Sequence, residues 1–126
     1  MKTINFIDKD WKIPGYELDD LEPETRDKVI AEHASFLIQT MAFEDLSENF
    51  QKGINRAEKL QTPWFTLSHV LDNAEDEVID NIRANNYLFD ADGELLPVTY
   101  HVRNNKIDHV TCRQGKKEFL VTLEDN

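Results

Sequence analysis

The hydrophobic pattern of this chain changes its period near residue 86, and this change limits the possible folds more than any other feature. Before it, apolar residues recur every three to four positions in three stretches, at about 23–41, 46–60 and 67–82. From Tyr87 onward apolar and polar residues alternate, and the turn sequences "DADG", "NN" and "QGKK" interrupt the alternation. The sequence therefore predicts three helices followed by an antiparallel β-meander, with "TINFI" near the start as a further candidate strand.

Several residues mark helix boundaries before that change. Pro23 suits the first turn of a helix, where a backbone N–H is not needed, and Pro63 ends the second helical stretch. Gly53 weakens the second stretch, because glycine disfavours a helix interior. Asp72 and Glu75 have the Asp-x-x-Glu form of a helix start, so the third stretch has a candidate restart at Asp72.

The first hairpin of the meander has a predicted register. A two-residue turn at Asn104-Asn105 places Arg103 opposite Lys106. Because side chains alternate between the two faces of a strand, three pairs are then expected on the core face. These pairs are Val102 with Ile107, Tyr100 with His109, and Val98 with Thr111.

The second hairpin must bring Phe119, Val121 and Leu123 to that same face. Given the first register, this requires a three-residue turn, Gln114 to Lys116, which pairs Thr111 with Phe119 and His109 with Val121. The predicted fold is then an α+β arrangement, with about three N-terminal helices packed on a C-terminal antiparallel meander of about four strands.

Composition and charge exclude several classes of protein. A chain of 126 residues, 40% hydrophobic and 31% charged, suits one globular domain, so a single domain over 1–126 is expected. No stretch approaches the roughly 20 apolar residues of a membrane span, and the first residues lack the apolar run of a signal peptide. The single cysteine, Cys112, fits a reducing compartment, so a cytoplasmic location is expected. The net charge of -11 disfavours binding to nucleic acid or anionic membranes and favours a basic partner.

The segment "HVRNNKIDHVTC" contains residue types that bind metals. In the predicted register, however, His109 faces the core while His101, Asp108 and Cys112 face the other side, so no tetrahedral zinc site closes. "FDADGEL" has a calcium-like appearance, but its glycine and acids miss the spacing of an EF-hand loop, and Asp90, Asp92 and Gly93 suit a tight turn. We therefore expect no metal and no cofactor.

The most acidic segment is 72–95, with eight carboxylates and one arginine. On a helix, acids four residues apart form one ridge, and like charges at that spacing cost about 0.2–0.5 kcal/mol per pair. A solvated face explains such a run, and so does a docking surface for a basic groove. The candidate partner-binding residues are the ridge Asp72, Asp76 and Asp80, the neighbouring Glu75 and Glu77, and Asp19, Asp20 and Glu22 of "YELDDLEPE".

The leading hypothesis for function is a non-enzymatic intracellular binding protein whose acidic helix surface occupies a basic site on a partner protein. A nuclease or a CRISPR effector has such a site, and anti-defence inhibitors and immunity proteins use it. One alternative is a small-molecule-binding or enzymatic domain with a pocket between sheet and helices, using His109, Tyr100 and His33. The other is a structural or assembly protein that forms a homodimer through an edge strand of the meander.

Overall fold

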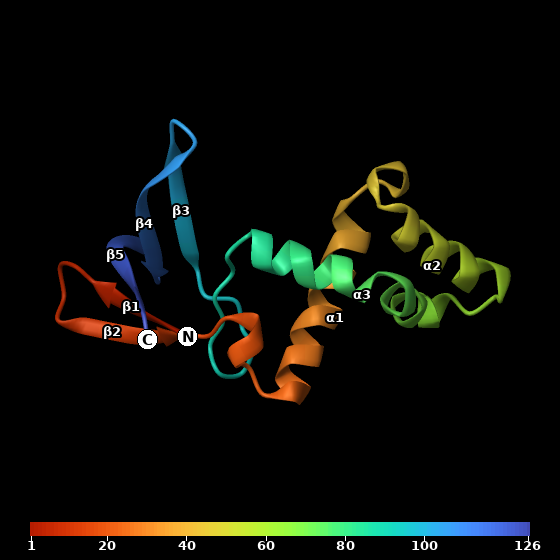
Figure 1. The fold of residues 1–126 in the computed structure, drawn as a ribbon, viewed down its shortest axis with the longest axis horizontal. Coiled ribbons are helices and arrows are strands. Elements are labelled where there is room, and N and C mark those ends of the chain that lie inside the picture. The colour runs from red at the N-terminus through yellow and green to blue at the C-terminus, as the bar shows by residue number, and fades with distance from the viewer. The chain divides into compact units, whose positions relative to one another are not determined.

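The computed structural model describes residues 1–126, which form two compact units. Unit 1 combines the two ends of the chain, residues 1–22 and 86–126, and contains every strand; unit 2 is the segment 23–85 and contains the three α-helices (Figure 1). Helices together with an antiparallel sheet confirm the α+β class. That residues 1–126 fold as a single domain stays a prediction. No helix is both long enough and apolar enough to cross a membrane.

The sheet of unit 1 has five strands in the order β2-β1-β5-β4-β3, and every pair is antiparallel. The predicted C-terminal meander of about four strands has three, β3, β4 and β5, and two strands rather than one candidate strand precede the helices. β1 contains most of the candidate strand "TINFI", whereas β2 was not predicted. Pro14 lies in β2, where proline is tolerated because β2 is an edge strand. The strands are β1 (Lys2–Phe6), β2 (Trp11–Gly15), β3 (Val98–Arg103), β4 (Lys106–Gln114) and β5 (Lys117–Asp125).

The core of unit 1 lies on one face of this sheet. Ile4 and Phe6 of β1 meet Cys112 of β4 and Val121 of β5, and Leu88 completes the cluster; each of the five is at most 4% exposed. Fully burying a side chain such as Ile4 or Val121 contributes about 1.5–3 kcal/mol, and partly buried apolar side chains surround the five. The surrounding residues are Ile13, Leu96, Val98, Val110, Phe119 and Leu123.

The β3–β4 hairpin begins as predicted and then departs from the predicted register. Asn104 and Asn105 form the turn, both with positive φ, as a type I′ turn requires, and Val102 pairs with Ile107. The next pair is His101 with His109, so Asp108 is an extra residue in a β-bulge. The predicted pairs of Tyr100 with His109 and Val98 with Thr111 are therefore wrong. Tyr100 pairs with Val110, and Val98 pairs with Cys112.

The bulge also corrects the second hairpin. Gln114 pairs with Lys117, so the turn is the two residues Gly115 and Lys116 rather than three, and Gly115 has a φ of +62°. Because the bulge has already advanced β4 by one residue, this shorter turn is the one that puts Phe119 and Val121 on the core face. That Phe119, Val121 and Leu123 share the core face is confirmed. The predicted pairs of Thr111 with Phe119 and His109 with Val121 are wrong; Thr111 pairs with Leu120.

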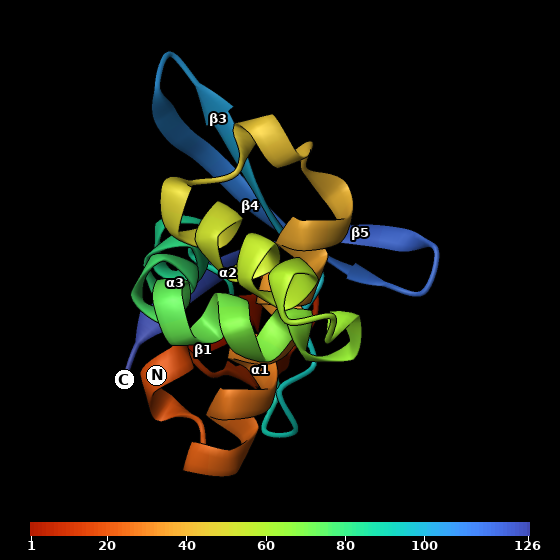
Figure 2. The ribbon, with the colours of Figure 1, turned by 90° about the vertical axis from the view of Figure 1, so that its right-hand side faces the viewer.

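The β3–β4 hairpin extends beyond the rest of the sheet. β5 pairs with β4 only from Val110 onward, so residues 106–109 of β4 have β3 as their single neighbour. All residues from 102 to 109 are exposed. Figure 2 shows the β3–β4 and β4–β5 hairpins pointing in different directions from the sheet. We call residues 101–109 the hairpin arm.

Unit 2 contains α1 (Pro23–Thr40), α2 (Glu48–Lys59) and α3 (Thr66–Ala84). The three predicted helices are confirmed, and α1 begins at Pro23 as expected. Short 3-10 turns, η2 (Phe43–Asp45) and η3 (Pro63–Phe65), connect them. α3 packs against both other helices. Its buried side chains are Val70, Ala74, Val78, Ile79 and Ile82.

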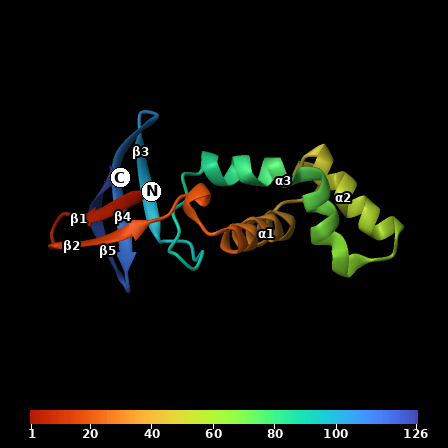
Figure 3. The ribbon, with the colours of Figure 1, turned by 60° about the horizontal axis from the view of Figure 1, so that its bottom comes forward.

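α3 is bent at Ala74, where φ is -137° and ψ is 17°. The change of direction is visible in Figure 3 as the ribbon passes from green to turquoise. Before the bend, Val70 packs against Gly53 of α2. After it, Asn81 lies 2.7 Å from the Nε2 atom of His33 in α1. α3 is therefore interrupted as expected, but the predicted position of the restart, Asp72, is wrong, because the non-helical residue is Ala74.

Candidate docking surface on helix α3

Four of the five predicted acids on α3 are exposed, and their side chains form no hydrogen bond or ion pair within the chain. The sequence has no lysine or arginine between Lys59 and Arg83, so no basic side chain of α3 lies among them. Their negative charge is therefore presented to solvent without a side-chain partner in the chain. These four residues, which we call the acidic face, are Asp72, Glu75, Asp76 and Asp80.

The bend divides the predicted ridge. Ala74 is not helical, so Asp72 is not one helical turn from Asp76, and the ridge as predicted is wrong at that point. Asp76 and Asp80 do lie on one helical segment, separated by about 6 Å along its axis. Glu75 and Asp76 stand in the first turn of that segment, where the helix dipole favours negative charge. The dipole therefore offsets part of the repulsion between the acids.

Glu77, the fifth predicted acid on α3, forms hydrogen bonds within unit 2. Its carboxylate accepts hydrogen bonds from the Ser47 hydroxyl and, at 2.8 Å, from the Asn49 side-chain amide. Ser47 is also the N-cap of α2, where its oxygen accepts the Phe50 backbone N–H at 3.3 Å. Glu77 therefore joins α3 to the start of α2, and the sequence spacing alone did not distinguish it from its exposed neighbours.

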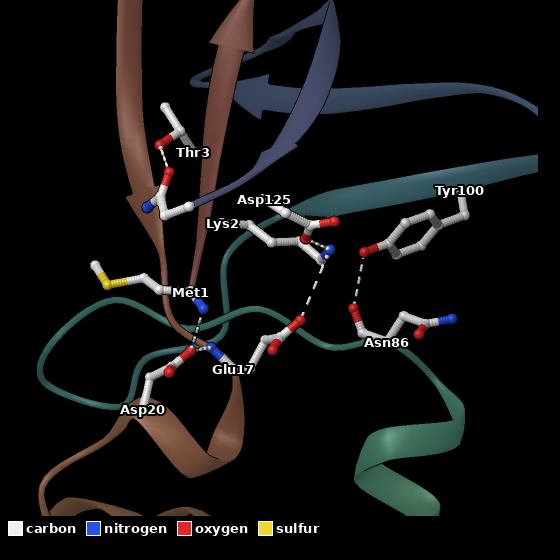
Figure 4. A network of polar contacts seen from close by, with 9 residues as sticks. Met1, Lys2, Thr3, Glu17, Asp20, Asn86, Tyr100 and Asp125 are labelled. Atoms are coloured by element: carbon white, nitrogen blue, oxygen red, sulfur yellow. Dashed lines mark hydrogen bonds and ion pairs between the residues drawn. The ribbon is translucent and has the colours of Figure 1, made fainter.

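Asp20 is also engaged, within unit 1. Its carboxylate forms an ion pair with the Met1 amino group at 3.0 Å and accepts the Glu17 backbone N–H at 3.0 Å (Figure 4). The hydrogen bond from the Met1 amino group, followed by the one from Glu17, holds the pKa of the Asp20 carboxyl below its usual value. Asp20 therefore ties Met1, the residue before β1, to the 3-10 turn η1 (Leu18–Asp20).

Figure 4 shows that the same region contains a second polar group. Lys2 forms ion pairs with Asp125 and, at 3.8 Å, with Glu17. The hydrogen bond to Asp125 raises the pKa of the Lys2 ammonium and lowers that of the Asp125 carboxyl. Tyr100 donates to the Asn86 backbone carbonyl at 2.8 Å, and burial raises the pKa of its hydroxyl. These contacts give Tyr100 a structural partner.

Asp19 and Glu22 are exposed in unit 1, whereas the acidic face belongs to unit 2. A joint docking surface formed by both groups of acids stays a prediction. Within unit 2, the structure brings Glu75, Asp76 and Asp80 together on one helical segment. Those three residues are the centre of the candidate docking surface.

The histidines of the hairpin arm form a cluster that the predicted register did not allow. His101 and His109 are paired across β3 and β4, and their rings stack with centroids 4.2 Å apart and planes 6° apart. Asp108 lies 2.8 Å from the Nδ1 atom of His109, and Thr111 lies 3.0 Å from the Nε2 atom of His101. Placing His109 on the core face was therefore wrong, and so was separating it from His101. The bulge at Asp108 is the reason.

Cys112 faces the core rather than the exposed side of the sheet. It is fully buried, and this burial raises the pKa of its thiol. The sequence placed Cys112 on the same side as His101, which is wrong because the bulge reverses the alternation after Asp108. A buried, neutral thiol is an unreactive one.

Two further surface features stand outside the predicted sites. Trp64 and Phe65 are 73% and 53% exposed. A wide, open hollow lies beside the tip of the hairpin arm and is lined only by residues between Arg103 and Asp108. One hairpin cannot enclose a small molecule on all sides, so this hollow lacks the concave form of a ligand pocket.

No group of three or more histidine, cysteine, aspartate or glutamate side chains converges in a geometry that could hold a metal ion. Comparison with protein-family models, with curated proteins and with solved structures finds no match for this chain.

Proposed function

We propose that this chain is a non-enzymatic binding protein whose acidic face docks on a basic surface of a partner protein. The observation that carries the proposal is the set of four exposed, unpaired carboxylates on α3. Three of them share one helical segment that is fixed by packing against α1 and α2. A rigid element that presents several charges in a fixed arrangement loses little conformational freedom on binding.

The chemistry of the acidic face favours a partner that handles nucleic acid. Such enzymes carry lysine and arginine grooves that bind phosphate oxygens, and carboxylate oxygens offer the same charge and the same acceptors. Occupying that groove would block the substrate. A nuclease or a CRISPR effector inhibited in this way is therefore the proposed target, and the chain itself needs no catalytic group and no cofactor for the role.

Glu77 and Asp20 are not part of the proposed contact surface. Both carboxylates are held by hydrogen bonds inside their own units, and exchanging those contacts for a partner would leave Ser47 or the Met1 amino group without its acceptor. The proposal therefore depends on Asp72, Glu75, Asp76 and Asp80.

Affinity capture from the source cells tests the proposal. The tagged chain is compared with an Asp76→Lys, Asp80→Lys variant and with an Asp8→Lys, Asp10→Lys variant. The second variant changes the net charge by the same amount, at two exposed acids between β1 and β2. A protein that binds the wild type and the control, is lost from the acidic-face variant, and is inhibited as a nuclease by the wild type supports the proposal. A partner retained equally by all three chains contradicts it.

The homodimer alternative receives less support from the fold. β3 is an edge strand of only six residues, and the bulge at Asp108 of β4 interrupts its pairing with β4, so it offers a short template for edge pairing. The other edge, β2, contains Pro14. Sedimentation or light scattering at two protein concentrations decides this point, because a dimer through either edge would double the measured mass.

A further inference from the structure

The stacked histidine pair at the base of the hairpin arm has the features of a metal-binding site. His101 and His109 lie on neighbouring strands, on the face of the sheet opposite to Cys112, and the His109 side chain is 42% exposed. A divalent ion can therefore reach the pair without any opening of the core. We propose that His101 and His109 together bind one divalent transition-metal ion of the kind that prefers imidazole nitrogen, such as Cu²⁺ or Zn²⁺.

Asp108 prepares His109 for this role. Its carboxylate oxygen lies 2.8 Å from Nδ1 of His109 and accepts the hydrogen there, which leaves the Nε2 lone pair of the neutral ring free. A carboxylate on the second nitrogen of a ligating histidine fixes the tautomer and raises the basicity of the ligand. The bulge is what makes this contact, because in a regular strand Asp108 and His109 would point to opposite faces.

Thr111 holds one nitrogen of His101, as Asp108 holds one nitrogen of His109. Its hydroxyl oxygen lies 3.0 Å from Nε2 of His101 and accepts a hydrogen from it when Nδ1 is the free nitrogen. Thr111 is only 8% exposed, so this partner is fixed. Each histidine thus has one nitrogen held by a neighbour and one nitrogen available.

The rings must change orientation to share one ion. Lone pairs lie in the ring planes, and the two planes are nearly parallel, so one ring turns about its Cβ–Cγ bond when the ion binds. Two imidazole nitrogens leave the remaining coordination positions to water or to a group from a partner, which makes this an open site. The site belongs to unit 1 and is independent of the acidic face.

Titration of the metal-free full chain with Cu²⁺ alone, and separately with Zn²⁺ alone, tests the proposal. We expect one ion per chain and nitrogen hyperfine coupling in the electron paramagnetic resonance spectrum of the Cu²⁺ form. His109→Gln should weaken binding at least tenfold, and Asp108→Asn should weaken it about 10–100-fold with an unchanged melting temperature. His69→Gln, which changes a histidine of unit 2, should leave the affinity unchanged.

A measurement on the wild type does not depend on how the variants fold. Substoichiometric Cu²⁺ should broaden the imidazole proton resonances of His101 and His109 in the nuclear magnetic resonance spectrum, and should spare those of His33 and His69. Broadening of nuclear magnetic resonance signals confined to the carboxylate-rich α3 would overturn the proposal. So would an electron paramagnetic resonance spectrum that shows only oxygen ligands, or a His109→Gln variant that binds Cu²⁺ as tightly as wild type.

Discussion

Gly53 of α2 lies directly against the backbone of Val70 in α3. A β-carbon at position 53 would stand 2.5 Å from the Val70 α-carbon and 2.7 Å from its backbone nitrogen. Non-bonded atoms essentially never approach a β-carbon that closely. The backbone of Val70 also cannot relieve the contact by changing rotamer, as a side chain could. The glycine that weakens α2 as an isolated helix is therefore the residue that lets α2 and α3 approach closely.

Gly53→Ala should destabilise the protein by roughly 2 kcal/mol or more, because overpacking at a helix contact outweighs the gain of about 1 kcal/mol in helix propensity. Urea unfolding followed by circular dichroism measures the change. Lys52→Ala is the control, since the neighbouring Lys52 is exposed and its ion pair with Glu48, at 3.4 Å, is worth at most about 0.5 kcal/mol. A Gly53→Ala variant as stable as the control would show that the helices do not pack as described.

Glu77→Ala should lower the free energy of unfolding by about 1–2 kcal/mol, because it removes the acceptor for Ser47 and Asn49 at the start of α2. Asp80→Ala is the matched control on the same helical segment. Asp80 is exposed and unpaired, so its loss should change the stability by less than about 0.5 kcal/mol. Equal effects of the two substitutions in thermal unfolding would mean that Glu77 is not held as described.

Asp20 gives a pH dependence with a defined sign. Its pKa is lowered in the folded chain, so its ion pair stabilises the fold at pH values above the unfolded pKa of about 3.9 and loses this effect as pH falls through the lower, folded pKa. The difference in melting temperature between wild type and Asp20→Asn should therefore be constant near neutral pH and shrink below about pH 4. A difference that stays constant down to pH 2 would mean that the Asp20 carboxylate has no partner in the folded state.

The register of the sheet can be tested by comparing two substitutions to aspartate, one at Val121 and one at Ile107. Val121 is 4% exposed in the core, so Val121→Asp buries an unpaired carboxylate and should cost at least about 3 kcal/mol. Ile107 was predicted on the same core face, but it is 56% exposed on the hairpin arm. Ile107→Asp should therefore leave the melting temperature nearly unchanged. A large loss of stability in Ile107→Asp would favour the regular register over the bulged one.

The sequence predicted the elements with strong periodicity and missed the local irregularities. α1 begins at Pro23 as expected, and the Asn104-Asn105 turn is in place. The bulge at Asp108 could not be predicted, because one extra residue in a strand has no composition signal of its own. That single residue moved His109 and Cys112 to the faces opposite to those predicted.

The candidate docking surface was predicted only in part, and again the missing information concerned contacts between elements that are distant in the sequence. Helical spacing identifies which acids share a helix, but it does not say which of them meet a donor from another helix. Glu77 and Asp80 look alike in the sequence, and only the position of Ser47 distinguishes them. The bend at Ala74 lies two residues beyond the restart that the Asp-x-x-Glu pattern predicted, so that pattern indicated an interruption of the helix but not its position.

The most direct test of the docking proposal is the dissociation constant of the captured partner for three chains. These are wild type, the acidic-face double variant Asp76→Lys, Asp80→Lys, and the control double variant Asp8→Lys, Asp10→Lys. The proposal predicts that the acidic-face variant binds at least tenfold more weakly, while the control binds like wild type. It also predicts that wild-type association slows as salt rises from about 0.05 to 0.5 M, over which the Debye length falls from about 14 to 4 Å. An affinity that is indifferent to the acidic-face substitutions and an association rate that is indifferent to salt would contradict it.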